Sequence, residues 1–96
     1  MTQADAYTPP PAKTMDDIGK VADFIKARVD PLRDTAPFKS DQERSFQALL
    51  DLLVMLKASA RSDIERGTDP AMQHFQLTIA ASQWNDHPDF LPEWRP

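Results

Sequence analysis

The chain has 96 residues, a formal net charge of −4 at pH 7 and no cysteine. This length fits a single domain, and the absence of cysteine excludes disulfides, thiolate zinc sites and cysteine nucleophiles. The acidic balance argues against nucleic acid or an anionic membrane as a partner, because both attract clustered basic residues.

The first 13 residues are predicted to be a disordered, proline-rich lead. The run Thr8-Pro9-Pro10-Pro11 cannot be helical and favours polyproline II. A proline triplet can be a ligand for an aromatic groove, but this one lacks a spaced second proline with basic flanks, which favours a stiff spacer. Residues 1–6 lack the basic and apolar regions of a signal peptide, and no apolar stretch approaches the roughly 20 residues that span a bilayer. We therefore expect a soluble, cytoplasmic protein.

A first helix is predicted over residues 14–30. Thr14 can accept a hydrogen bond from the backbone amide of Asp17, whose carboxylate can reach back to the capping residue. The helix is expected to end near Asp30, because Pro31 disfavours the helical conformation of the residue before it. Its apolar stripe, with Phe24 at the edge, has helical spacing and predicts the core face: Ile18, Val21, Ala22, Ile25 and Val29.

A second helix, the longest, is predicted over residues 41–66. Ser40 and Glu43 have the spacing of a capping box, and neither proline nor glycine follows until Gly67. The predicted core seam alternates by three and four residues and consists of Phe46, Leu49, Leu53, Leu56 and Ala60. Further apolar side chains surround this seam, so we expect burial on several sides.

Two shorter helices cannot cover every side of residues 46–56. The uncovered face is expected around Leu52, Met55 and Ser59. An exposed apolar face of this kind is typical of a binding surface. We therefore predict that the central helix binds a protein partner or associates with itself, as in a homodimer.

A third helix is predicted over residues 70–84, with Asp69 as its N-cap and Pro70 at its first position. Its core stripe is predicted to be Met72, Phe75, Ile79 and Ala80, widened by Leu77, Ala81 and Trp84. Residues 85–96 contain three prolines and no helical periodicity, and are predicted to be non-helical. They also carry Phe90, Leu91 and Trp94, so we expect this tail to be ordered against the helices.

The tail allows two interpretations. In the first, which we favour, Phe90 and Trp94 fold back over the third helix and complete a small core. In the second, Trp94 and Arg95 project into a pocket of a partner as the residues that dominate its binding energy.

No residue pattern predicts catalysis, a cofactor or a metal site. His74 has no carboxylate or histidine three or four residues away, and the two glycines cannot form a phosphate-binding loop. The serines lack the context of a nucleophile. An alternative prediction uses His87, Asp89 and Arg95 of the tail as a ligand-binding or catalytic group.

Two segments carry a family resemblance. Residues 23–30 contain an aromatic, an aliphatic and a basic residue followed by Ala-Arg and an acidic end. The tail contains His87-Pro88-Asp89-Phe90 and then Glu93-Trp94-Arg95-Pro96. Both resemble a family of short, uncharacterised proteins from actinobacteria and their phages. The resemblance implies a source and no reaction.

The sequence as a whole predicts an all-α protein, a three-helix bundle whose central helix is long and whose aromatic tail packs on it. The predicted function is that of a non-enzymatic protein-interaction module, such as a phage or accessory protein that binds and modulates a bacterial host protein. The alternative is a small enzyme or ligand-binding subunit.

Overall fold

The computed structural model describes residues 10–95, and this range contains three α-helices and no strand. Helix α1 spans Met15–Thr35, α2 spans Asp41–Glu65 and α3 spans Ala71–Ala81. Two short 3-10 turns, Ser82–Trp84 and Pro92–Trp94, follow in the C-terminal segment. The chain is therefore an all-α three-helix bundle with a long central helix, as predicted. The predicted disordered lead falls largely outside the described residues.

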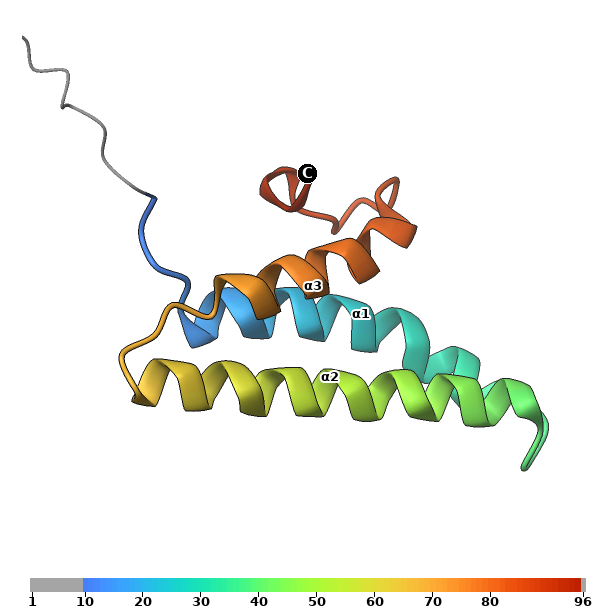
Figure 1. Ribbon diagram of the computed structural model, residues 1–96. Helices are drawn as coiled ribbons and strands as arrows, with labels where there is room; N and C mark the ends of the chain where they lie inside the picture. The colour runs from blue at the N-terminus through green and yellow to red at the C-terminus, as the bar shows by residue number, and fades with distance from the viewer. Residues whose placement is uncertain (1–9, 96) are drawn as a thin grey trace, which may run out of the picture.

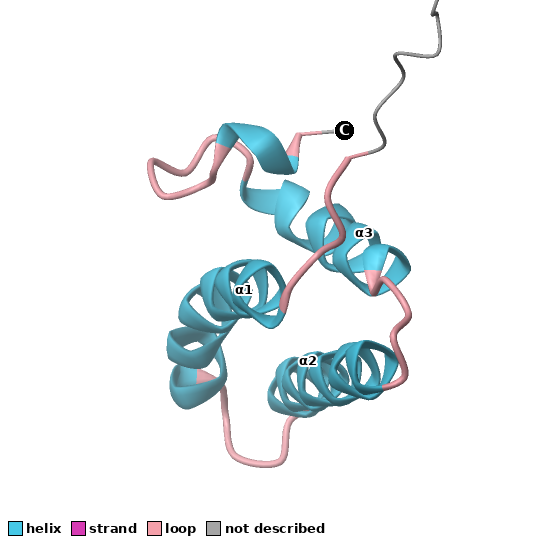
Figure 2. Cartoon of the chain, turned by 90° about the vertical axis from the view of Figure 1, so that its left-hand side faces the viewer, coloured by secondary structure: helices cyan, strands magenta, loops and turns pink. Residues whose placement is uncertain are grey.

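The three helices run in alternating directions, with α1 and α3 pointing one way and α2 the other (Figure 1). Viewed along the bundle, they lie at the corners of a triangle (Figure 2). Helix α3 has 11 residues whereas α2 has 25. Since each residue adds about 1.5 Å, α3 can cover only part of the length of α2.

Helix α1 begins with the predicted capping box. The Thr14 hydroxyl accepts from the Asp17 amide at 3.2 Å, and the Asp17 carboxylate accepts from the Thr14 amide at 2.9 Å. The hydrogen bond from the Thr14 backbone lowers the pKa of the Asp17 carboxyl below its ordinary value of 3.8. The predicted apolar stripe of α1 is confirmed, because all of its residues and Phe24 are buried.

The end of α1 differs from the prediction. The helix does not stop at Asp30 but continues through Pro31 to Thr35. Pro31 removes one backbone donor and disfavours helix at Asp30, but the turn that follows is supported by other groups. The Thr35 hydroxyl donates to the Pro31 carbonyl at 2.9 Å, and Arg33 forms ion pairs with Asp30 and Asp34.

Helix α2 begins where predicted and ends one residue earlier. The Ser40 hydroxyl accepts from the Glu43 amide at 3.1 Å, while the Glu43 carboxylate accepts from the Lys39 amide at 2.7 Å. Gly67 follows the helix with φ of 77°, the left-handed conformation that favours glycine. The core seam is rotated from the prediction: Leu50, Leu53 and Ala60 are buried, whereas Phe46, Leu49 and Leu56 are only half-buried.

Helix α3 is shorter than predicted and starts differently. Pro70 occupies the N-cap position, and no side chain caps the helix. The Asp69 carboxylate, predicted to be that cap, instead accepts from the backbone amide of Lys13 at 3.0 Å. Asp69 thereby fastens the chain before α1 to the chain before α3. The α-helix ends at Ala81, and residues 82–84 tighten into a 3-10 turn.

Candidate protein-interaction surface

The central helix presents an apolar face to solvent. Leu52 is 53% exposed and Met55 is 65% exposed, and Ser59 lies exposed one turn further along α2. In Figure 1, α1 and α3 both lie above α2, and α3 reaches this face at Ser59, whose hydroxyl accepts from Gln73 at 2.9 Å. The predicted exposure of these three residues, which we name the α2 stripe, is confirmed. Their role in binding stays a prediction.

Helix α3 has an exposed apolar stripe of its own, and here the prediction was wrong. Met72, Phe75 and Ile79, predicted to be core, are between 47% and 64% exposed. The opposite side of the helix is buried, with Leu77 and Ala81 fully enclosed. Both sides of α3 are apolar, so helical spacing could not decide which one faces the bundle. We name Met72, Phe75 and Ile79 the α3 stripe.

Polar groups on the buried side of α3 set its rotation. The Gln73 side-chain amide donates to the Ser59 hydroxyl at 2.9 Å and to the Asp63 carboxylate at 2.7 Å. Both acceptors lie on α2, so these bonds join the C-terminal half of α2 to the first turn of α3. Ser59 of the α2 stripe is thus in contact with α3 through Gln73. Gln73 and His74 gave no sequence signal for this rotation, because polar side chains are normally expected on the exposed side of a helix.

The tail packs as a core element. Trp94 is only 5% exposed, and its ring lies 5.2 Å from that of Phe24 on α1 and 5.4 Å from that of Phe90. Such tilted and edge-to-face contacts are favourable between aromatic rings. The prediction that Trp94 binds a partner is therefore not supported by its position, since its ring is enclosed by its own chain. Phe90 and Trp94 are buried, as the first interpretation predicted. Their rings contact Phe24 of α1, whereas the sequence placed them over the third helix.

Arg95 lies on the surface beside this cluster. Its guanidinium donates to the Asn85 carbonyl at 3.1 Å and lies 5.5 Å from the centre of the Phe90 ring. Both contacts hold the last described residue against the tail. Arg95 is exposed and remains accessible at the edge of the tail, away from the α2 stripe.

The structure does not unite His87, Asp89 and Arg95 into a site. The His87 ring packs edge-on against Phe24 at 5.6 Å, and its nitrogens lie in contact with the Arg28 guanidinium. Asp89 lines a shallow cavity of about 540 Å³ between α1 and the tail, but neither His87 nor Arg95 lines it. Within residues 10–95 there is no group of three or more residues that could hold a metal ion. His87 and Arg95 instead contact their own chain, and Asp89 is joined to His87 only through its backbone amide, which donates to the ring at 3.0 Å.

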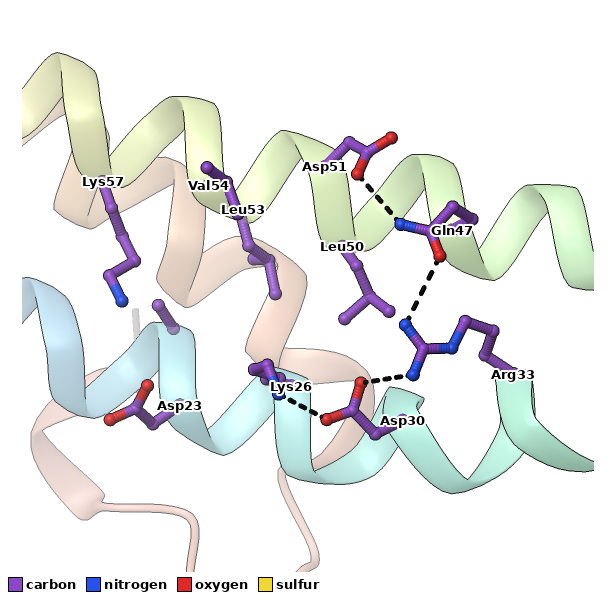
Figure 3. Close-up of a pocket in the computed structure, with 11 residues that line it drawn as sticks. Asp23, Lys26, Asp30, Arg33, Gln47, Leu50, Asp51, Leu53, Val54 and Lys57 are labelled. Carbon is purple, nitrogen blue, oxygen red and sulfur yellow. Dashed lines mark hydrogen bonds and ion pairs between the residues drawn. The ribbon is translucent and has the colours of Figure 1, made fainter.

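A second groove, of about 260 Å³, lies between α1 and α2. A chain of polar contacts runs along it, from Lys26 through Asp30 and Arg33 to Gln47 (Figure 3). The Lys26 ammonium pairs with Asp30 at 2.6 Å, and Arg33 donates to Gln47 across the two helices at 3.4 Å. The charges in the groove balance, with three aspartates facing two lysines and an arginine. This arrangement holds α1 against α2.

His74 is buried where α3 meets the start of α1. Burial lowers the pKa of its imidazole below the ordinary value of 6.5, and the charge of Lys13 lowers it further. The Asp17 carboxylate acts in the opposite direction, and more weakly. His74 is therefore a neutral core residue at neutral pH.

Among residues 10–95, no helix is long and apolar enough to cross a membrane. Comparisons with known protein families, curated proteins and solved structures found no match to this chain. A functional assignment therefore rests on the surfaces described above.

Proposed function

We propose that this chain is a non-enzymatic protein-interaction module that acts through the α2 and α3 stripes. The observation that carries the proposal is the exposure of five large apolar side chains on two adjoining helices of one small domain: Leu52, Met55, Met72, Phe75 and Ile79. Single exposed apolar residues are normal on a protein surface, but a grouped set marks a binding site.

We propose that the partner is a bacterial host protein. The resemblance of the first helix and the tail to short actinobacterial and phage proteins supports an accessory protein that binds and modulates a bacterial host protein. The aromatic residues of that tail, Phe90 and Trp94, are used for the core. Binding is therefore assigned to the helical stripes.

The test is a double substitution of Leu52→Glu and Met55→Glu. Two carboxylates on the α2 stripe should abolish association, because the apolar contact would have to bury charge. Both side chains are exposed in the free chain, so helicity and thermal unfolding should remain close to wild type. The readouts are circular dichroism, light scattering for self-association, and a tagged pull-down from an actinobacterial lysate read by mass spectrometry.

A matched control is Val54→Glu with Ala58→Glu. It adds the same two charges to α2 at exposed positions on a different side of the helix. Association that survives in the control and disappears in the test variant would support the α2 stripe. Unfolding of the test variant, or identical association in both variants, would overturn the proposal.

A further inference from the structure

Residues on the outward side of α2 recur with heptad spacing. Positions along it alternate by three and four residues, and five of the six are exposed: Ser45, Ala48, Leu52, Met55 and Ser59, followed by the half-buried Ser62. This spacing places them in one row along the helix, which is the pattern by which two helices pack side by side. The buried seam around Leu50 and Leu53 faces α1 separately. Helix α2 therefore carries a second, largely exposed row, which α3 contacts at Ser59, where the hydroxyl accepts from Gln73.

The row matches itself when a second copy is laid along it in the opposite direction. Leu52 then faces Met55 of the second copy, Ala48 faces Ser59 of the second copy, and Ser45 faces Ser62 of the second copy. Large side chains meet at the centre, and small ones meet on both sides of it. Small residues allow two helix backbones to approach closely, and a two-fold axis between the central pairs repeats every contact.

The charges at the two ends of α2 favour this antiparallel arrangement. Asp41 is set opposite Arg66 of the second copy, and Arg44 opposite Glu65 of the second copy. Arg44 and Glu65 are exposed, and within residues 10–95 neither forms a salt bridge. They stand at opposite ends of α2, roughly 30 Å apart, and cannot pair within one chain. A parallel arrangement would instead place Arg44 against Arg44 and Arg66 against Arg66.

The exposed apolar area of the two stripes also approaches the area that a dimer interface needs. Helix α3 diverges from the N-terminal half of α2 (Figure 1), which leaves Phe46 and Leu49 only half-buried. In the antiparallel arrangement this half lies along the C-terminal half of the second copy's helix, beside the α3 stripe. The two stripes expose roughly 600 Å² of apolar residues per copy, and a standard interface needs about 800 Å² from each partner. The small residues of the row and the charged ends supply the remainder.

We propose that the α2 stripe holds a second copy of this chain, in an antiparallel two-fold pairing of α2 with α2. The proposal rests on the proposed function and identifies the partner of that surface.

A cross-linking experiment tests the direction and the register. Since the chain has no cysteine, the single variants Ala48→Cys and Ser59→Cys each introduce one thiol into the full chain. On mild oxidation, a mixture of the two variants should form a mixed disulfide dimer, whereas each variant alone should form little. Different tags on the two variants identify the mixed product on a non-reducing gel. Equal cross-linking of Ala48→Cys with itself would indicate a parallel pairing and overturn the proposal.

A charge-reversal cycle tests the pairing of Arg44 with Glu65. Arg44→Glu and Glu65→Arg should each weaken the dimer about fivefold in sedimentation equilibrium, since each change turns two attractive pairs into repulsive ones. The double variant should regain wild-type affinity. Each substitution places its new charge where the dipole of α2 favours it, so neither should impair the helix. Absence of recovery in the double variant would contradict this register.

The outcomes separate the two proposals. A wild-type chain that stays monomeric at high concentration yet retains one identified host protein through Leu52 and Met55 would overturn the dimer and support the interaction module. A monomer that retains nothing would overturn both. A dimer with the predicted cross-link and charge recovery would support both.

Discussion

At the scale of single residues, Phe24 joins the tail to the helices. Its ring lies on the buried side of α1 and contacts three tail residues, His87, Phe90 and Trp94, at centre distances of 5.6, 5.9 and 5.2 Å. The guanidinium of Arg28 lies 5.3 Å from the same ring. A cation and three rings around one phenylalanine bury much of the apolar area that a tail without regular secondary structure can contribute.

Trp94 and Arg95 are neighbours whose substitutions are expected to destabilise the protein to different extents. Trp94→Ala should lower the free energy of unfolding by about 3 kcal/mol, because it removes a buried ring and leaves a cavity. Arg95→Ala should lower it by less than about 1 kcal/mol, because its contacts are exposed. Urea unfolding followed by circular dichroism compares the two. Equal effects would contradict the assignment of Trp94 to the core.

The burial of His74 predicts that the stability of the protein depends on pH. Its pKa in the folded chain is below the ordinary value of 6.5, so the unfolded chain binds the proton more tightly. The stabilisation is complete above about pH 6.5 and is lost as the pH falls towards the folded pKa. Unfolding free energies at pH 7.5 and 5.5 should therefore differ more for the wild type than for His74→Gln, which has no titrating ring. An unchanged difference in this variant would assign the pH dependence to other groups.

At the scale of elements, α1 shows how a helix tolerates a proline near its end. Pro31 lies inside the helix, four residues before its end at Thr35. Local polar contacts on both sides of the proline support this turn, including the 2.6 Å pair of Lys26 with Asp30. The interruption that the sequence predicts is thus reduced to the loss of a hydrogen bond.

Replacing this proline should stabilise the protein. An interior proline costs a helix about 3 kcal/mol, but proline also restricts the unfolded chain, which offsets about 1 kcal/mol. We expect Pro31→Ala to raise the free energy of unfolding by about 1–2 kcal/mol in urea titrations. Pro88→Ala is the control, since Pro88 lies in a tail turn where proline is favourable. A loss of stability in Pro31→Ala would show that the proline supports α1.

At the scale of the whole molecule, the difference in length between α2 and α3 decides which apolar surface stays exposed. Helix α1 accompanies α2 along most of its length, but α3 departs from it towards the tail (Figure 1). A domain of 96 residues has a limited core, and here both α2 and α3 keep an apolar row outside it. This exposed area is the physical basis on which we propose both the interaction module and the antiparallel dimer.

Local chemistry made much of the fold predictable. The capping box of Thr14 and Asp17 and the stop at Gly67 involve residues within one helical turn of each other, so their partners could be identified from spacing alone. The stripe of α1 was also predictable, because the opposite side of that helix is polar. The exposure of Leu52 and Met55 followed from an excess of apolar residues over the helices available to cover them.

What the sequence by itself determined, therefore, was the number of helices, the starts of α1 and α2, and the existence of an uncovered face on α2. Only the tertiary structure decided which apolar side of α3 faces inward, that α1 continues past Pro31, and that Trp94 packs on Phe24. These features depend on contacts between residues far apart in the chain, such as those of Gln73 with Ser59 and Asp63. Periodicity records how apolar residues are spaced along one helix, but it does not record which neighbour each side will meet.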